Sequence, residues 1–225
     1  MRRYLFPLIF GCLGVAVLVA LGLWQVQRLA WKEAILADMA ARMTADPVPL
    51  ETLVPDPLTE RYRAVSISGR TTGEDLLVLT GKAGVGPGYE VIAVFQTLTG
   101  ERLMVDLGFI TEELRHKLRP GRAMTIVGNL VWPDEQDSFT PDPDLAARLW
   151  YARDVASMSQ FLQTSPILVV SRTAEGGDPA IVPVPVTTAG VPNNHLNYAI
   201  TWFSLAVVWA GMTLALAWRI RQGKE

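Results

Sequence analysis

Residues 5–24 read LFPLIFGCLGVAVLVALGLW and contain no charged side chain. An α-helix rises about 1.5 Å per residue, so a stretch of this length spans the ~30 Å hydrocarbon core of a bilayer. A second uncharged stretch, residues 196–218, reads LNYAITWFSLAVVWAGMTLALAW. The two stretches predict a transmembrane helix near each end of the chain.

The charges beside these stretches predict how the chain is oriented. Basic residues flank both stretches on the side of the chain ends: Arg2, Arg3, Arg219, Arg221 and Lys224. Cytoplasmic flanks are enriched in Lys and Arg, so we expect residues 1–4 and 219–225 in the cytoplasm. Residues 25–195 then form an extracytoplasmic domain between the spans 5–24 and 196–218. Arg28 and Lys32 lie just beyond the first span and weaken this bias locally.

The first apolar stretch also bears on the compartment. It is longer than the apolar core of a signal peptide, and no A-x-A cleavage site follows it. Cys12 would be the lipid-carrying residue of a lipoprotein, but bulky Phe10 fits that processing poorly. No transit peptide rich in Arg and Ser is present. We therefore expect a multi-pass protein of a bacterial inner membrane with a periplasmic domain.

Composition excludes several function classes. The formal net charge of −2 leaves no overall basic field that would attract nucleic acid. The only cysteine, Cys12, lies inside the first apolar stretch, so the domain between the spans holds neither a disulfide nor a thiolate metal site. Its stability must come from an apolar core.

The pattern between the spans predicts a β-rich domain with short helices. Strong helix formers at residues 30–43 extend the first helix, and Pro47 and Pro49 end it. A short helix is expected at residues 155–162, with Asp154 as its N-cap. Short β-rich runs separated by turn residues lie at 62–68, 76–80, 89–97, 102–110, 124–131 and 167–171. We predict a membrane α+β protein, in which two transmembrane helices flank an antiparallel sheet or small open barrel.

Enzyme signatures are scarce in this domain. There is no G-x-S-x-G, H-E-x-x-H or C-x-x-C motif. Residues 81–88 (GKAGVGPG) resemble a phosphate loop only in glycine content, because a strand follows them where a phosphate site needs a helix. His116 lies among charged residues and is expected at the surface. A tethered hydrolase remains an alternative, using the carboxylates of one proline-containing loop: Asp134, Glu135, Asp137, Asp142 and Asp144.

His195 lies at the predicted outer end of the second span. If Asn194 caps the helix, His195, Tyr198 and Trp202 follow at i, i+3 and i+7 and share one face. An imidazole above two aromatic rings can supply an axial ligand to a flat apolar cofactor such as haem. Arg28 and Lys32, one turn apart on the first helix, can pair with haem propionates. The alternative is that His195 is only a polar anchor at the membrane surface.

Several stretches resemble signatures of the surfeit locus protein 1 family. Residues 21–32 (LGLWQVQRLAWK), followed by Ala41-Arg42, resemble its first signature. Gly88-Tyr89 resembles its central motif, and the stretches SFTP (138–141) and WYARD (150–154) resemble its third region. Residues 192–203 (PNNHLNYAITWF) match its closing signature almost residue for residue.

The resemblance implies an assembly factor for haem–copper cytochrome c oxidase rather than an enzyme. Members of this family bind haem a, in transit or stably, and assist its insertion into catalytic subunit I. The resemblance makes His195 the axial ligand of the haem iron and places Trp24, Gln25, Arg28 and Trp31 beside it. The implied partners are oxidase subunit I, haem a synthase and membrane lipid. The alternative function is a scaffold that stabilises subunit I without itself carrying haem.

Two positions depart from the family pattern. Leu107 stands where the family usually has Arg, in an Arg-Gly-Trp-Val stretch, and Val94 stands where Pro is usual after Gly-Tyr-x-Val. The missing Arg removes a charge that could contact a partner or a propionate. The signatures at the two predicted spans are unaffected.

Overall fold

The computed structural model describes residues 2–82 and 84–223, with side chains from residue 5 onward. The chain divides into two compact units. A helical unit comprises the residues up to Asp38 together with those from Thr188 onward, and a β-rich unit comprises Met39–Thr187. Arg2, Arg3 and Tyr4 have side chains outside the described part, as has Lys224, so the basic flanks are described only in part.

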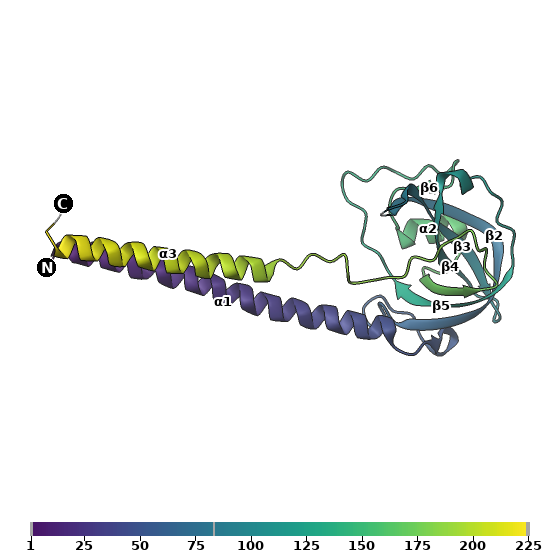
Figure 1. The fold of residues 1–225 in the computed structure, drawn as a ribbon. Helices are drawn as coiled ribbons and strands as arrows, with labels where there is room; N and C mark the ends of the chain where they lie inside the picture. Colours follow the sequence, from purple (N-terminus) through teal and green to yellow (C-terminus); the bar gives the residue numbers. More distant parts are fainter. Residues whose placement is uncertain (1, 83, 224–225) are drawn as a thin grey trace. The chain divides into compact units, whose positions relative to one another are not determined.

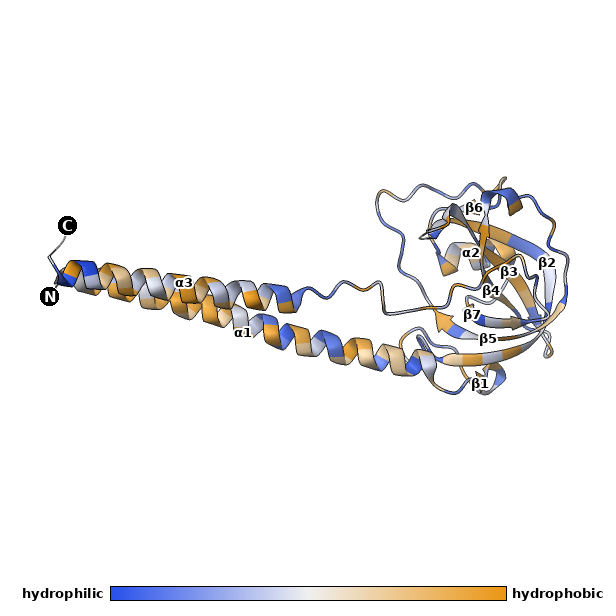
Figure 2. Ribbon diagram, viewed as in Figure 1, coloured by the Kyte–Doolittle hydropathy of each residue, from blue (hydrophilic) through white to orange (hydrophobic). Residues whose placement is uncertain are grey.

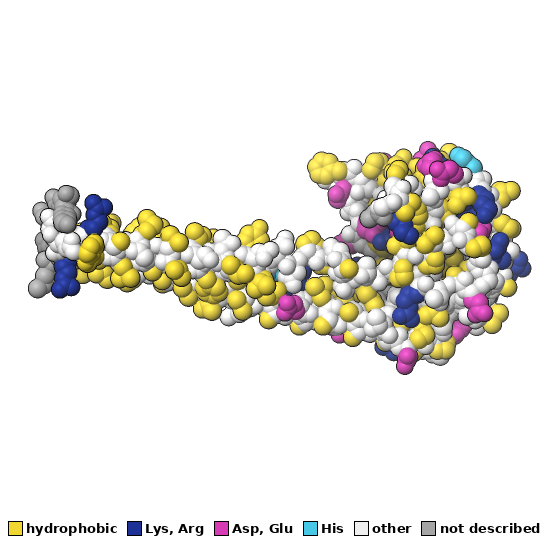
Figure 3. All heavy atoms as spheres, viewed as in Figure 1, with side chains coloured by type: hydrophobic (Ala, Val, Ile, Leu, Met, Phe, Trp, Pro, Cys, Tyr) yellow, Lys and Arg dark blue, Asp and Glu magenta, His cyan; other side chains and the backbone are white. Residues whose placement is uncertain are grey.

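The helical unit pairs α1 (Arg2–Thr44) with α3 (His195–Arg221), and the two lie side by side (Figure 1). Both are long and apolar enough to cross a membrane by length and composition: their most apolar windows have mean hydropathies of 2.5 and 1.8. Only 11% of each window is buried, whereas the core helix of a soluble protein would be mostly buried. Apolar residues predominate along the pair (Figure 2) and cover the face shown in Figure 3.

Glycines of α1 let its backbone approach α3 closely. A Cβ built on Gly11 would lie 2.1 Å from a side-chain atom of α3, one on Gly14 2.3 Å and one on Gly22 2.6 Å. The α3 side chains that occupy these spaces are, in the same order, Thr213, Trp209 and Phe203. Any larger residue at these positions would therefore push the helices apart.

The β-rich unit is a closed barrel rather than the open barrel we predicted. Its strands follow the order β2, β3, β4, β7, β5, and β5 pairs back onto β2. The pairs of barrel strands are antiparallel, as predicted, except β4 with β7, which is parallel. The barrel strands are β2 (Ala64–Lys82), β3 (Gly86–Thr97), β4 (Arg102–Thr111), β5 (Ala123–Val131) and β7 (Leu168–Glu175).

Closure depends on the length of β2. Two predicted strands merge into this one 19-residue strand, which bends at an irregularity between Thr71 and Asp75, where Gly73 has φ +90°. Its first part pairs with β5, whereas pairing with β3 continues to its end. A bend of this kind lets one strand serve two neighbours around a small barrel.

Short elements decorate the barrel. The strand β1 (Val48–Pro49) and the strand β6 (Leu149–Trp150) each add a parallel pairing to β2. Two 3₁₀ turns, Leu50–Thr52 and Glu112–Leu114, lie in the connections. The β3–β4 hairpin turns at Gly100, which has φ +90° and lies between the predicted β-rich runs 89–97 and 102–110.

Because side chains alternate between the two faces of each strand, the apolar core consists of two clusters, one inside the barrel and one on its outer face. One cluster fills the barrel and includes Ile67, Phe95 and Val105; the other lies on its outer face and includes Ile92 and Met104. The helix α2 (Val155–Leu162) covers the outer cluster with Val155, Met158 and Leu162. The predicted N-cap is confirmed, because Asp154 Oδ1 accepts a hydrogen bond of 3.0 Å from the Ala156 N–H.

Both departures from the family pattern are buried. Leu107 belongs to the barrel interior and Val94 to the outer cluster under α2. Val94 is fully buried, and Leu107, 8% exposed, contributes to the lining of a hollow in the β-rich unit.

The last turn of α1 is tied to the barrel within the β-rich unit. Asn129 Nδ2 donates to the Met43 carbonyl at 3.0 Å and to the Tyr62 carbonyl at 3.1 Å. Arg172 Nη1 also donates to the Met43 carbonyl, at 2.9 Å. Helix C-terminal carbonyls lack partners within the helix, so these side chains satisfy one of them.

Asn129 is 1% exposed, so its loss should destabilise the β-rich unit. We expect Asn129→Ala to lower the free energy of unfolding by about 1–3 kcal/mol, because the buried carbonyls of Met43 and Tyr62 lose a donor. Chemical denaturation followed by circular dichroism measures the change. Thr125→Ala, at an exposed position of the same strand, is the control. Equal stability of the two variants would contradict the capping role.

Candidate functional site

The structure brings His195 and Gln25 together across the helical unit. His195 is the first residue of α3, and Asn194 occupies the N-cap position without a side-chain capping hydrogen bond. The His195 Nδ1 atom lies 2.8 Å from Gln25 Oε1. Gln25 is only 8% exposed, although it lies in an apolar helix. The hydrogen bond therefore satisfies a polar group at the helix interface.

This contact determines which imidazole nitrogen is free. An amide oxygen only accepts, so Nδ1 must carry the proton and donate it to Gln25 Oε1. The neutral ring then has a lone pair on Nε2, which makes no hydrogen bond to any residue that the structure describes. Metal-ligating histidines have the same arrangement: one ring nitrogen donates to a fixed acceptor, and the other is free to bind the metal.

The predicted cations also lie on α1 near this contact. Lys32 donates from Nζ to the carbonyl of Pro192, three residues before His195. The Arg28 guanidinium lies 4.1 Å from the centre of the Trp31 ring, a cation–π distance. In the described part of the chain, no carboxylate pairs with Arg28 or Lys32. Their charges are held in place and remain available to an anion.

The aromatic residues are only partly gathered. Trp24, Trp31 and Tyr198 are each more than half exposed, and Trp202 is half-buried. Tyr198 lies about 60° around α3 from His195, as the helical spacing requires. Among the described residues, no hydrogen bond or ring contact joins Trp24, Tyr198 or Trp202 to His195. The indole Nε1 of Trp202 is buried and has no partner among those residues.

The tautomer of His195 can be tested without any cofactor. In the full-length protein, nitrogen NMR at alkaline pH should show His195 protonated on Nδ1, because Gln25 accepts that proton. Gln25→Leu removes the acceptor and should shift the ring toward protonation on Nε2. His116, which is exposed, provides an internal control that should not change. Protonation of wild-type His195 on Nε2 would contradict the assignment.

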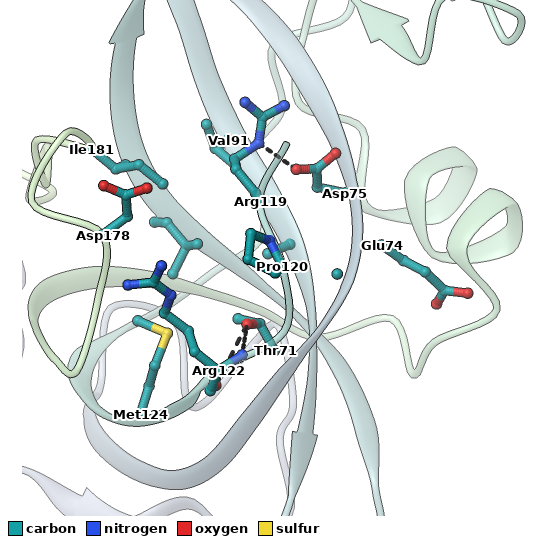
Figure 4. Close-up of a pocket in the computed structure, with 13 residues that line it drawn as sticks. Thr71, Glu74, Asp75, Val91, Arg119, Pro120, Arg122, Met124, Asp178 and Ile181 are labelled. Atoms are coloured by element: carbon teal, nitrogen blue, oxygen red, sulfur yellow. Dashed lines mark hydrogen bonds and ion pairs between the residues drawn. The ribbon is translucent and has the colours of Figure 1, made fainter. Parts of the chain in front are cut away.

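A hollow at one end of the barrel is the other candidate. Its apolar lining comes from the barrel interior, including Val91 and Met124, and its rim is charged (Figure 4). Arg119 forms an ion pair with Asp75, and the Arg122 Nη1 atom donates to the Gly177 carbonyl at 3.3 Å. These contacts engage the rim groups with one another, so the rim has a structural role.

Two carboxylates of the predicted loop, Asp137 and Asp144, accept hydrogen bonds from groups of the loop itself. Asp134 is exposed, and Asp137 accepts hydrogen bonds from the Phe139 N–H and the Thr140 hydroxyl. Those bonds lower the pKa of Asp137, with the Phe139 N–H as the larger cause.

Glu135, near the start of the same loop, has a partner outside the loop. Arg153 donates to its carboxylate from Nε at 3.1 Å and from the backbone N–H at 3.0 Å. Burial opposes ionisation of Glu135, but the hydrogen bonds from Arg153 outweigh it and lower its pKa.

The same guanidinium faces two carboxylates that sequence reasoning missed. Arg153 Nη1 lies 3.4 Å from Asp106 Oδ2 and 3.5 Å from Glu90 Oε2. Asp106 is 1% exposed, and burial, followed by the like charge of Glu90, raises its pKa to about 7. Burial also raises the pKa of Glu90. The sequence feature that could have revealed Glu90 and Asp106 is their charge within the otherwise apolar strands β3 and β4.

Asp106 should make stability depend on pH. Folding raises its pKa, so the folded state keeps a proton that the unfolded chain has already lost, and stability falls as pH rises toward 7. We expect Asp106→Asn to flatten the fall in melting temperature between about pH 5 and about pH 8. Asp142→Asn, at an exposed position, should keep the wild-type slope. Parallel slopes for all three proteins would contradict the assignment.

Comparisons with known proteins agree with the sequence resemblance. The sequence pattern of the SURF1 family matches residues 12–207, a range that contains both Gln25 and His195. The chain is 30% identical to a SURF1-like protein of Monosiga brevicollis, over 89% of this chain and 83% of that protein. It is 28% identical to a SURF1-like protein of Rickettsia felis, over 85% of this chain and 88% of that protein. It is 26% identical to Surfeit locus protein 1 of Homo sapiens, over 83% of this chain and 69% of that protein.

Proposed function

The chain belongs to the SURF1 family, and from this membership we propose that it is an assembly factor for haem–copper cytochrome c oxidase. In this proposal it is not an enzyme. It binds haem a received from haem a synthase and assists the insertion of haem a into subunit I.

The observation that supports haem binding most directly is the free Nε2 of His195. When bound, haem supplies an iron that accepts an imidazole nitrogen as axial ligand. His195 would provide that nitrogen, and Gln25 would hold the ring through Nδ1. Because Gln25 is engaged in this way, its role is to orient His195 rather than to contact the cofactor.

The surrounding residues fit an amphiphilic, anionic group. Arg28 and Lys32 would neutralise carboxylates, with Arg28 already placed over Trp31. The exposed rings of Trp24, Trp31 and Tyr198 would cover an apolar surface. The unpartnered Nε1 of Trp202 is a buried donor without an acceptor among the described residues, as expected where a further group completes the site.

We also propose the membrane arrangement. The start of α1 and the end of α3 lie at the same end of the helical pair (Figure 1), and Arg219 and Arg221 occupy the last turn of α3. These features support cytoplasmic termini and a periplasmic β-rich unit in a bacterial inner membrane.

A visible absorption spectrum tests the function. The full-length protein purified from cells that make haem a should show a haem spectrum, and His195→Ala should lose it because the iron loses its axial nitrogen. His116→Ala changes the other histidine, which is exposed, and should leave the spectrum intact.

Two outcomes would count against the proposal. Retention of the haem spectrum and affinity by His195→Ala would show that the site is wrong. If His195→Ala lost haem but still supported full oxidase assembly, the protein would act as a scaffold for subunit I, without a need for haem.

A further inference from the structure

The connection between β5 and β6, residues 132–148, is fixed at both ends. Near its start, Arg153 binds Glu135 through its guanidinium and its backbone N–H. Near its end, Asp144 and Leu149 exchange two backbone hydrogen bonds of 2.9 Å. Because both ends are tied to the barrel, the residues between them form an ordered loop rather than a free chain.

The tip of this loop presents one aromatic side chain to solvent. Phe139 is 90% exposed. Its backbone N–H donates to Asp137 Oδ1 at 2.9 Å, and the Thr140 hydroxyl donates to the same oxygen, also at 2.9 Å. The ring is therefore held out on a backbone that is already ordered. Little conformational freedom would be lost if a partner buried it.

The charges around Phe139 are predominantly acidic. Residues 132–148 contain five carboxylates and one basic residue, Arg148, at the end of the loop, where its guanidinium lies 5.7 Å from the centre of the Phe161 ring. The carboxylates are Asp134, Glu135, Asp137, Asp142 and Asp144. Within the part of the chain that the structure describes, Glu135 alone among these five carboxylates forms an ion pair, with Arg153. The exposed remainder would attract a basic surface and would be repelled by anionic lipid headgroups.

We propose that residues 132–148 form a docking loop for a protein partner whose surface has an apolar pocket with a basic rim. Phe139 enters the pocket, and the carboxylates face the rim. This proposal unites the stretches 138–141 and 150–154, which the haem site does not use: the second anchors the loop through Arg153, and the first carries its tip. The identity of the partner, oxidase subunit I, rests on the proposed function.

Binding of the full-length protein in nanodiscs to purified, haem-free subunit I tests the proposal. Phe139→Ala should weaken binding about tenfold or more, because buried aromatic anchors dominate interface energies. Leu58→Ala is the matched control, since Leu58 is also 90% exposed and lies elsewhere. Asp142→Lys should weaken binding and reduce its salt dependence, whereas Glu175→Lys, at another exposed carboxylate, should do neither.

The possible outcomes distinguish failure of the docking loop from failure of the proposed function. Equal affinity of wild type, Phe139→Ala and Asp142→Lys would overturn the docking loop while leaving the proposed function intact. Failure of the wild type to bind subunit I at all, with a normal haem spectrum, would overturn both the partner and the loop assigned to it. Loss of self-association in Phe139→Ala, seen by analytical ultracentrifugation without loss of subunit I binding, would make the occupant a second copy and overturn the proposal.

Discussion

The candidate site depends on how closely α1 and α3 approach each other. Three positions of α1 that face α3 carry no Cβ, and side chains of α3 fill the space that a Cβ would need. On α3, Ala199 and Ala206 are the buried residues, and both are small. Small residues on both helices allow backbone contact in an environment where the hydrophobic effect does not drive helices together. At this separation Gln25 can reach His195 directly, and one nitrogen of the imidazole is left free.

The family signatures fall into the two units and correspond to different chemistry. The first signature, except for Ala41-Arg42, and the closing signature lie in the helical unit and supply an imidazole, two cations and three indoles. The third region lies in the β-rich unit, where Arg153 gathers Glu90, Asp106 and Glu135 on one guanidinium. Removing such a guanidinium would leave several carboxylates without compensation, so this anchor is costly to lose. The groups of the proposed haem site and those of the proposed docking loop therefore lie in separate units.

Local sequence patterns predicted most of the helices and strands. They did not predict which segments, distant in sequence, pair with each other. The apolar stretches, the Asp154 cap and the turn at Gly100 follow from residues that are neighbours in sequence. The barrel closes because the first part of β2 pairs with β5 and the rest of β2 pairs with β3. No local sequence pattern predicts these two pairings. The Gln25–His195 contact depends on the rotation of two helices whose contacting residues are 170 positions apart. The contact between Glu135 and Arg153 joins residues 18 positions apart and is likewise absent from any local pattern.

Engineered cysteines at the helix interface test the pairing of α1 and α3 most directly. A Cβ at position 11 would lie 2.8 Å from the Cβ of Thr213, about 1 Å closer than the two Cβ atoms of a disulfide, so a small separation of the helices brings this pair to bridging distance. Leu214, by contrast, is 71% exposed and turned away. In a protein with Cys12→Ser, mild oxidation should join Gly11→Cys to Thr213→Cys within one chain. The pair Gly11→Cys and Leu214→Cys should stay reduced. Cross-linking of neither pair, or of both equally, would contradict the helix pairing from which the histidine site follows.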